Sequence, residues 1–314
     1  MRGTIAITDY GWYERLRALP NVDEVNFWKP TATRTFQADE FSPFLFKLRA
    51  PHRAICGFGF FARYSRLPDW LAWDTFDLGN GCASLEDMRG RILDIRERIH
   101  FRGAAPAEIG CILLVQPLFF PPPLWVAPPR DWPIRTQAEK KYDLDRGEGA
   151  RVWADCLAAA HRLTGESGSE YLLGQMAGGE QPRYGTPFLT RPRLGQRTFR
   201  IAVTDSYERG CAVTGEHSLP ALEAAHIKPY HKEGPHEVAN GLLLRADLHR
   251  LLDKGYVTIS TDLKLIVSRR LQTDFSNGRT YYPLDGRPVR PPRTARDQVN
   301  REYLKWHNNY VYLG

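Results

Sequence analysis

The chain has 314 residues, of which 42% are hydrophobic and 25% are charged. At roughly 150 residues per domain, this composition predicts a soluble protein of about two domains and excludes wholesale disorder. Its apolar runs are far shorter than the 18 or so residues of a membrane-spanning helix, and they are interrupted by proline. The start of the chain also lacks the apolar stretch of a secretory signal, so we expect a cytoplasmic protein.

Lys and Arg number 43 against 36 Asp and Glu, which gives a formal net charge of +7. An excess of positive charge is compatible with a polyanionic partner such as nucleic acid, although charge alone does not establish one. The five cysteines lie far apart in the sequence. Their spacing excludes a CxxC zinc site and favours buried, reduced thiols over disulfides.

The first zone, residues 1–135, is rich in aromatic residues and short apolar runs. Segments 44–48, 54–61 and 109–117 have the composition and boundaries of β-strands. Segment 84–99 has an apolar residue every three or four positions after Ser84, which predicts a helix with Ser84 as its N-cap. The zone therefore predicts an α+β domain built around a small sheet.

Residues 136–192 are polar and rich in Gly, Ser and Pro, apart from one helix predicted near 150–163. We interpret this stretch as a connector. The third zone, 193–314, contains the strongest functional signal of the sequence.

That signal consists of three blocks, which read Cys211-Ala-Val-Thr-Gly215, then Leu222-Glu-Ala-Ala-His-Ile-Lys-Pro229, then Asn240 to Gly255. We expect the first two blocks to be strands joined by a turn, and 247–254 to be a short helix that ends at Gly255. This order places a histidine on a strand opposite a histidine on a helix.

The blocks resemble the HNH endonucleases, whose active site is a ββα-metal motif, and in particular a subgroup found among bacterial restriction endonucleases. The resemblance identifies His226, Asn240 and His249 as the three name-giving residues. It implies DNA phosphodiester hydrolysis, with His226 as the general base and His249 as a metal ligand. Asn240 is expected to hold the loop and the base histidine, although in some members this position contacts the metal.

Asp253 lies four positions after His249 and so shares its helix face, which makes it the expected second ligand. Many HNH enzymes carry a further ligand immediately before the base, where this chain has Ala225. Glu223 points to the same side of the strand as Ala225 and is our candidate replacement. We expect Mg²⁺ or Mn²⁺, with Zn²⁺ or Ni²⁺ as alternatives if a second imidazole binds.

Several residues near the motif have competing interpretations. His226 and His249 have structural alternatives, as a core histidine and a solvated helix residue, and Asp253 has the alternative of stabilising a helix end. Lys228 follows the base and is a candidate phosphate contact, as is Arg200 in the segment before the motif. We expect His231 and His236, in a Gly- and Pro-containing loop, to be exposed to solvent.

The order of aromatic and apolar segments over roughly 20–120 loosely resembles the PUA-like superfamily, which includes the EVE and SRA readers of modified bases. This resemblance implies a small β-barrel or sheet with helices and a pocket for a base swung out of the duplex. Trp28 and Trp73 are the pocket candidates, and Asn80 is a candidate contact to a base edge. The alternative is that these aromatic residues fill an ordinary core.

Together these features predict a metal-dependent endonuclease acting on double-stranded DNA, a restriction enzyme for DNA carrying 5-substituted cytosine. The alternatives are a restriction enzyme that reads an unmodified sequence and a non-catalytic DNA-binding protein that retains the HNH fold. Because cutting both strands with one-metal sites requires two subunits, we also expect a homodimer.

Overall fold

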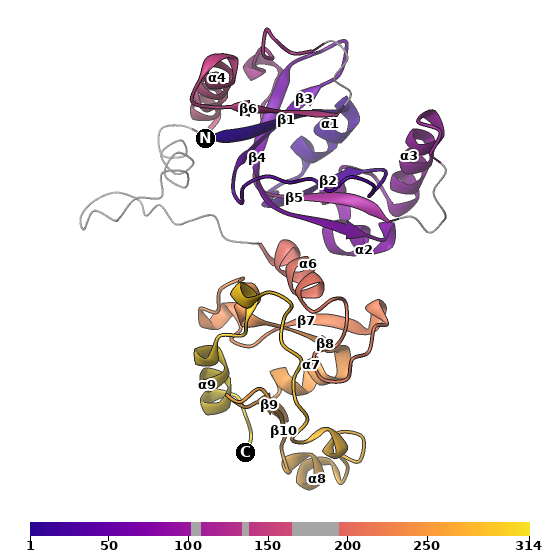
Figure 1. The fold of residues 1–314 in the computed structure, drawn as a ribbon, viewed down its shortest axis with the longest axis vertical. Helices are drawn as coiled ribbons and strands as arrows, with labels where there is room; N and C mark the ends of the chain where they lie inside the picture. Colours follow the sequence, from indigo (N-terminus) through magenta and orange to yellow (C-terminus); the bar gives the residue numbers. More distant parts are fainter. Residues whose placement is uncertain (102–107, 134–137, 165–194) are drawn as a thin grey trace, which may run out of the picture. The chain divides into compact units, whose positions relative to one another are not determined.

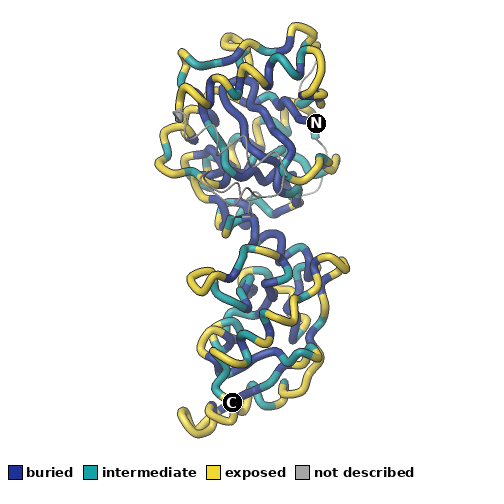
Figure 2. The backbone as a smooth tube through the Cα atoms, turned by 90° about the vertical axis from the view of Figure 1, so that its left-hand side faces the viewer, coloured by how far each residue is buried: buried dark blue, intermediate teal, exposed yellow. Residues whose placement is uncertain are grey.

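The computed structural model describes residues 1–101, 108–133, 138–164 and 195–314, and divides into two compact units, Met1–Pro192 and Arg193–Gly314. Each unit has a buried interior surrounded by exposed chain (Figure 2). In the described part of the chain, no helix is long and apolar enough to span a membrane.

The first unit is built on a six-stranded sheet in the order β2-β5-β4-β3-β1-β6 (Figure 1). Strands β1 and β3 pair in parallel, and the other neighbours are antiparallel. The strands are β1 (Arg2–Thr8), β2 (Glu24–Lys29), β3 (Pro43–Leu48), β4 (Ile55–Leu67), β5 (Ile109–Phe119) and β6 (Glu139–Asp143). The helices are α1 (Tyr10–Ala18), α2 (Asp69–Phe76), α3 (Leu85–Arg98) and α4 (Gly147–Thr164).

Helices cover both faces of this sheet. On one face, Trp12 of α1 packs edge-on against Phe46 of β3, with the ring centroids 5.1 Å apart. Leu45 is the neighbour of Phe46 along β3 and therefore points to the other face, as does its cross-strand partner Phe58. There Phe58 contacts Trp153 of α4 at 5.0 Å.

The structure confirms the predicted α+β class, the three predicted strands and the predicted helix. Ser84 is the N-cap of α3 and accepts a hydrogen bond from the backbone N–H of Asp87. Part of the predicted connector, 136–192, belongs to the first unit. Glu139–Asp143 form β6 and pair with β1. The rest of the expected connector, from 165 onward, lies outside the described residues.

The second unit contains two small antiparallel sheets, β7–β8 and β9–β10, with helices around them. Its elements are α6 (Gln196–Ser206), β7 (Leu222–His226), β8 (Gly241–Arg245), α7 (Ala246–Asp253), β9 (Val257–Ile259), β10 (Leu265–Val267), α8 (Arg270–Phe275) and α9 (Arg301–Tyr310). Short 3-10 turns cover Tyr230–Lys232 and Val238–Asn240 in the loop between β7 and β8.

The predicted first strand of the motif is wrong. Residues 211–214 form a turn, in which the N–H of Gly215 donates to the carbonyl of Cys211 and Gly215 has a φ of +74°. The two strands of the motif are instead β7 and β8, and the first strand is the one that carries His226. Val213, Leu222, Ile227 and the segment 242–244 are all buried in one hydrophobic cluster. All five cysteines are buried and free, as expected.

Candidate active site

The site lies where β7, β8 and α7 meet. β7 and β8 pair directly, with His226 opposite Gly241, and α7 follows β8 without a loop. Buried Ala225, Leu243 and Leu248 help to form the core beneath these elements. A strand end, a loop exit and a helix face are therefore held together by one hydrophobic core.

Asn240 is fully buried at the exit of the loop, as its predicted role requires. Its Oδ1 accepts from the N–H of Lys228 at 2.9 Å, and its Nδ2 donates to the carbonyls of Lys228 at 2.8 Å and Pro235 at 3.0 Å. With these bonds, the side chain fastens the beginning of the loop to its end. This placement favours the loop-holding role over contact with a metal.

His226 is half-buried between two other aromatic side chains. Its ring stacks on Phe199 of α6 at a centroid distance of 3.9 Å, and its Nε2 lies 3.0 Å from Nδ1 of His236. Burial, helped by the nearby His236 and His249, lowers the pKa of His226 to about 4. The imidazole is therefore neutral at pH 7 and able to accept a proton.

His249 lies between two carboxylates. Its Nδ1 is 2.7 Å from Oε2 of Glu223 on β7, and its Nε2 is 3.4 Å from Oδ2 of Asp253 one helical turn on. A carboxylate on one ring nitrogen orients an imidazole and leaves the other nitrogen to bind a metal. The structure thus places Glu223 against the ring nitrogen that faces away from Asp253.

The pair of His249 and Asp253 fits a divalent ion. Two ligands that each lie about 2.0–2.3 Å from one ion are separated by about 3 to 3.5 Å, which includes the observed 3.4 Å. Within the described residues, no group of three or more His, Cys, Asp or Glu side chains is arranged to hold an ion. Two protein ligands leave most positions to water and substrate oxygens, which suits Mg²⁺ or Mn²⁺.

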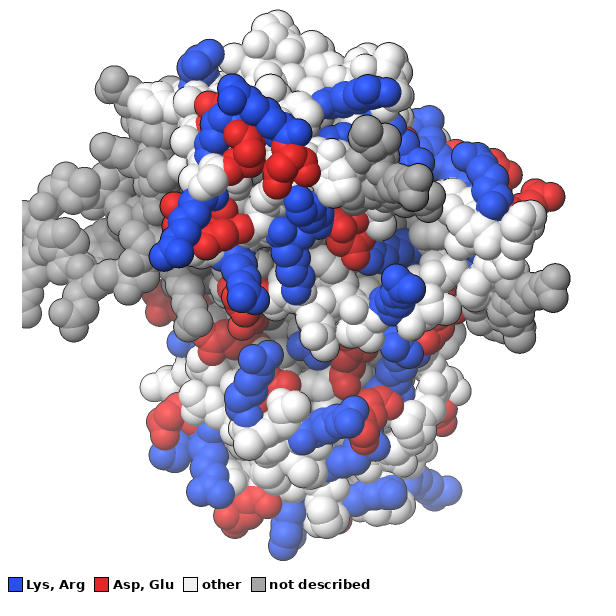
Figure 3. Space-filling view, turned by 45° about the horizontal axis from the view of Figure 1, so that its top comes forward, with Lys and Arg blue, Asp and Glu red and all other residues white. Residues whose placement is uncertain are grey.

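The two candidate phosphate contacts are close in sequence to residues of the site. Lys228 is in the loop after β7, with its Nζ 5.8 Å from the centre of the Trp306 ring, and Arg200 follows Phe199 on α6. On the face that Figure 3 shows, Lys and Arg are interspersed with Asp and Glu and form no single basic patch. The positive net charge therefore does not by itself point to a DNA-binding face.

The residues predicted for a base pocket in the first unit differ in their burial and contacts. Trp28 on β2 and Trp73 on α2 are both half-buried, and Nε1 of Trp28 donates to the carbonyl of Asn80 at 3.0 Å. Asn80 is fully buried, and its amide bonds to Asn26 and to the carbonyls of Ala72 and Asp77. These bonds leave Asn80 no edge for a base, so its expected contact with DNA does not fit the structure.

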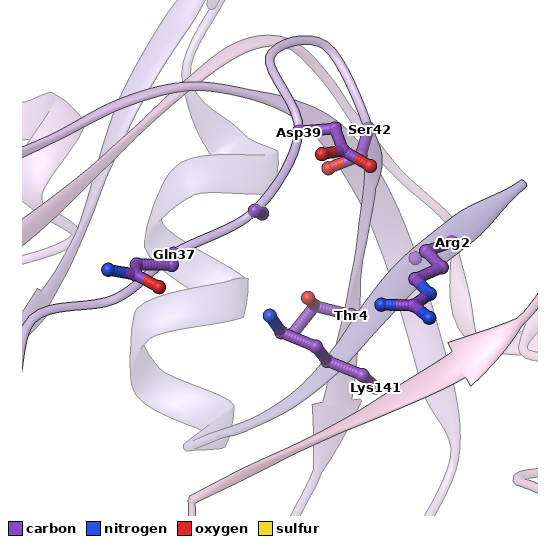
Figure 4. A pocket seen from close by; sticks show the side chains of 8 residues that line it. Arg2, Thr4, Gln37, Asp39, Ser42 and Lys141 are labelled. Carbon is purple, nitrogen blue, oxygen red and sulfur yellow. The ribbon is translucent and has the colours of Figure 1, made fainter.

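A cavity of about 440 Å³ opens elsewhere in the first unit. It is lined by Arg2, Gly3, Thr4, Gln37, Ala38, Asp39, Ser42 and Lys141. Arg2 and Lys141 come from the paired strands β1 and β6, opposite Asp39 and Ser42 of the loop before β3 (Figure 4). None of the residues that we predicted for a base pocket lines it.

Residues 211–260 match the family described as HNH endonuclease, and this range contains His226, Asn240 and His249. The chain carries an HNH endonuclease domain. The matched range includes all of β7, β8 and α7, so these elements belong to the matched domain, and the protein is a nuclease that acts on DNA. HNH nucleases generally use a divalent metal ion.

Two solved structures are similar to the chain. ASCH from Zymomonas mobilis is 10% identical with a TM-score of 0.33, over 48% of this chain and 93% of that one. A modification dependent TagI restriction endonuclease is 12% identical with a TM-score of 0.30, over 98% of this chain and 81% of that one. At these values the similarities decide neither fold nor function. The comparison with curated proteins gave no match.

The sequence did not predict the surroundings of His226, the expected general base. His236 was expected to be exposed, but it is half-buried and bonded to His226. The sequence predicted no role for Phe199 or Tyr230. In the structure, Phe199 stacks on His226 and Tyr230 stacks on His236. The sequence shows only that Phe199 is followed, many residues later, by His226 and His236. Such a pattern does not predict a contact.

Proposed function

We propose that the second unit hydrolyses DNA phosphodiester bonds with His226 as general base, Asn240 as the residue that holds the loop, and His249 and Asp253 as ligands of one divalent ion. The observation that carries this proposal is the convergence of these side chains. They come from a strand, a loop exit and a helix, and one core holds them together.

In this reaction, a water oxygen forms a bond to phosphorus while the bond from phosphorus to the 3′-oxygen breaks. His226 removes the proton from the attacking water, which a neutral imidazole can do at pH 7. A base with a pKa near 4 is weak, but a DNA phosphate placed beside it adds negative charge, which raises its pKa. The leaving 3′-oxygen takes up a proton from a solvent water, so the products are a 5′-phosphate and a 3′-hydroxyl.

His249 contributes one nitrogen and Asp253 one carboxylate oxygen to the proposed ion. Because the pair contains no second imidazole, it supports Mg²⁺ or Mn²⁺ over Zn²⁺ or Ni²⁺. A bound ion supplies positive charge for a phosphate oxygen and for the leaving oxygen. The sequence suggested Glu223 as a replacement for the ligand that is absent at Ala225. In this proposal Glu223 instead fixes the orientation of the His249 ring through Nδ1.

We assign the recognition of the DNA substrate to the first unit. We propose a restriction enzyme that prefers DNA with a cytosine modified at carbon 5, and that reads it with an aromatic pocket at Trp28 and Trp73. The half-buried position of both rings supports this assignment, because each keeps part of its surface available for stacking. Lys228 and Arg200 contact phosphates, and a homodimer provides the two cuts.

The test is cleavage of plasmid DNA, modified and unmodified, by the full chain with Mg²⁺ or Mn²⁺. We expect nicking that is lost in His226→Ala while DNA binding is retained, with Asn309→Ala, an exposed substitution on α9, as the matched control. Binding without nicking on every DNA would contradict the nuclease and favour a non-catalytic DNA-binding protein. Light scattering of the active protein tests the homodimer.

A further inference from the structure

His236 reaches the base histidine from the loop between β7 and β8. Its Nδ1 lies 3.0 Å from Nε2 of His226, a hydrogen-bonding distance between two ring nitrogens. Within the described residues, Nδ1 of His226 has no hydrogen-bond partner. One nitrogen of the base is thus occupied by His236, and the other is open.

Stacked rings fix the planes of both imidazoles. Phe199 lies on the ring of His226 at 3.9 Å and 15°, and Tyr230 lies on the ring of His236 at 4.4 Å and 8°. The loop position of His236 is also held, because Nδ2 of Asn240 donates to the carbonyl of the preceding Pro235 at 3.0 Å. The contact between the two histidines therefore belongs to a built arrangement rather than to two mobile side chains.

The position of one proton decides whether His226 can act as a base. If Nε2 of His226 carries the proton and donates to His236, Nδ1 of His226 keeps a lone pair that can accept a proton from water. If His236 donates instead, the proton of His226 lies on Nδ1, and both nitrogens of His226 are engaged. Only the first arrangement leaves a general base.

We propose that His236 is a positioning residue for the general base: it accepts the Nε2–H of His226 and thereby directs the lone pair of Nδ1 toward the attacking water. This inference rests on the nuclease function proposed above. When Nδ1 takes the proton from water, Nε2 keeps its own proton and its bond to His236, so no second proton transfer is needed. The bond then has a charged donor, which strengthens it as the proton is transferred.

Two variants separate the hydrogen bond from the stacking. His236→Phe keeps a ring against Tyr230 but removes the acceptor, and His236→Asn places an amide oxygen near the former position of Nδ1. We expect kcat for DNA cleavage to fall about 10–100-fold in His236→Phe, as for other orienting partners, with KM unchanged. His236→Asn should retain most of kcat. His231→Phe, at an exposed histidine of the same loop, should behave as wild type. A wild-type kcat in His236→Phe, or an equal loss in His236→Asn, would overturn the proposal.

A second measurement needs no cleavage. Nitrogen-15 NMR of the imidazoles in the DNA-free protein reports which ring nitrogen carries the proton. We expect His226 to be protonated on Nε2 in the wild type and to become a mixture of tautomers in His236→Phe. An active wild type with the proton on Nδ1 overturns the role of His236 alone, whereas an inactive wild type with the expected tautomer overturns the proposed function.

Discussion

The side-chain amide of Asn240 spans the backbone of Lys228, accepting its N–H at 2.9 Å and donating to its carbonyl at 2.8 Å. Both bonds require a side chain that carries an acceptor and a donor on the same carbon, as a carboxamide does. The same nitrogen also donates to Pro235. These three bonds explain why an asparagine stands between the two histidines, and they set the position of the loop that carries His236.

Replacing Asn240 should therefore destabilise the second unit. Asn240→Ala leaves buried backbone groups without partners, which costs about 1–3 kcal/mol for each group and about 2–4 kcal/mol in total after relaxation. Asn240→Asp should cost more, since it turns the donor into a carboxylate oxygen that faces two carbonyls. Calorimetric unfolding of the full chain measures the loss, with exposed Asn309→Ala as a control that stays within about 0.5 kcal/mol. An Asn240→Asp protein as stable as wild type would contradict this account.

The positions of the nuclease motif could be predicted from the resemblance to the HNH family, and the elements that carry it partly from short-range pattern. Apolar residues at Leu242–Leu244 and the helix that follows mark buried elements, and the spacing of His249 and Asp253 fixes a shared helix face. The first strand could not be predicted in the same way. Cys211–Gly215 has a strand-like composition, but the left-handed conformation of Gly215 and backbone bonds close it into a turn.

The contacts of His236 and Asn80 depend on long-range packing, which local pattern does not encode. His236 contacts His226 from a loop that Asn240 fastens through the carbonyl of Pro235. Asn80 follows α2 in a polar stretch that resembles a surface loop, yet it is fully buried, and Asn26 of β2 donates a hydrogen bond to its side-chain oxygen. Both residues are polar, so hydrophobic periodicity carries no information about their burial.

The roles of the three residues at the proposed metal site can be separated by titration with Mn²⁺ in the absence of DNA. We expect His249→Ala and Asp253→Asn to weaken Mn²⁺ binding strongly and to abolish cleavage. Glu223→Gln should weaken binding by only about 10–100-fold, since the amide oxygen still accepts from Nδ1 of His249. Asp262→Asn, at an exposed carboxylate, is the control. If Glu223→Gln loses the ion as completely as His249→Ala, Glu223 is a ligand.

The acid dependence of cleavage should reflect the environment of His226. Burial, with His236 and His249 nearby, lowers its pKa to about 4 in the DNA-free protein. A general base acts in its deprotonated form, so kcat/KM, which reports the free enzyme, should be lost as the pH falls through about 4. The assay requires saturating Mn²⁺ at each pH, because metal ligands also take up protons, and circular dichroism to confirm folding. A loss of kcat/KM centred near pH 6.5, the ordinary pKa of histidine, would show that burial does not lower the pKa of His226.

The preference for modified DNA should appear in the cleavage of matched phage DNAs carrying cytosine, 5-methylcytosine, 5-hydroxymethylcytosine or glucosylated bases. Swinging a base out of the duplex costs a few kcal/mol, which stacking on an aromatic ring can return. One added methyl or hydroxymethyl group in a fitted pocket contributes about 1–3 kcal/mol, or roughly 5- to 150-fold in kcat/KM. Equal cleavage of all four DNAs would remove the preference and leave the nuclease intact.

Variants of the first unit locate the pocket that produces such a preference. If Trp28 and Trp73 hold the base, Trp28→Ala and Trp73→Ala should abolish the preference while nicking of unmodified DNA continues. Trp28→Phe should largely keep it, because a ring remains for stacking although the bond to the carbonyl of Asn80 is lost. Asp39→Asn alters the cavity between β1, β6 and the loop before β3, which is a separate place in the same unit. Loss of the preference in Asp39→Asn with both tryptophan variants unaffected would move the base pocket to that cavity, where a carboxylate rather than an aromatic ring would distinguish cytosine by its exocyclic amine.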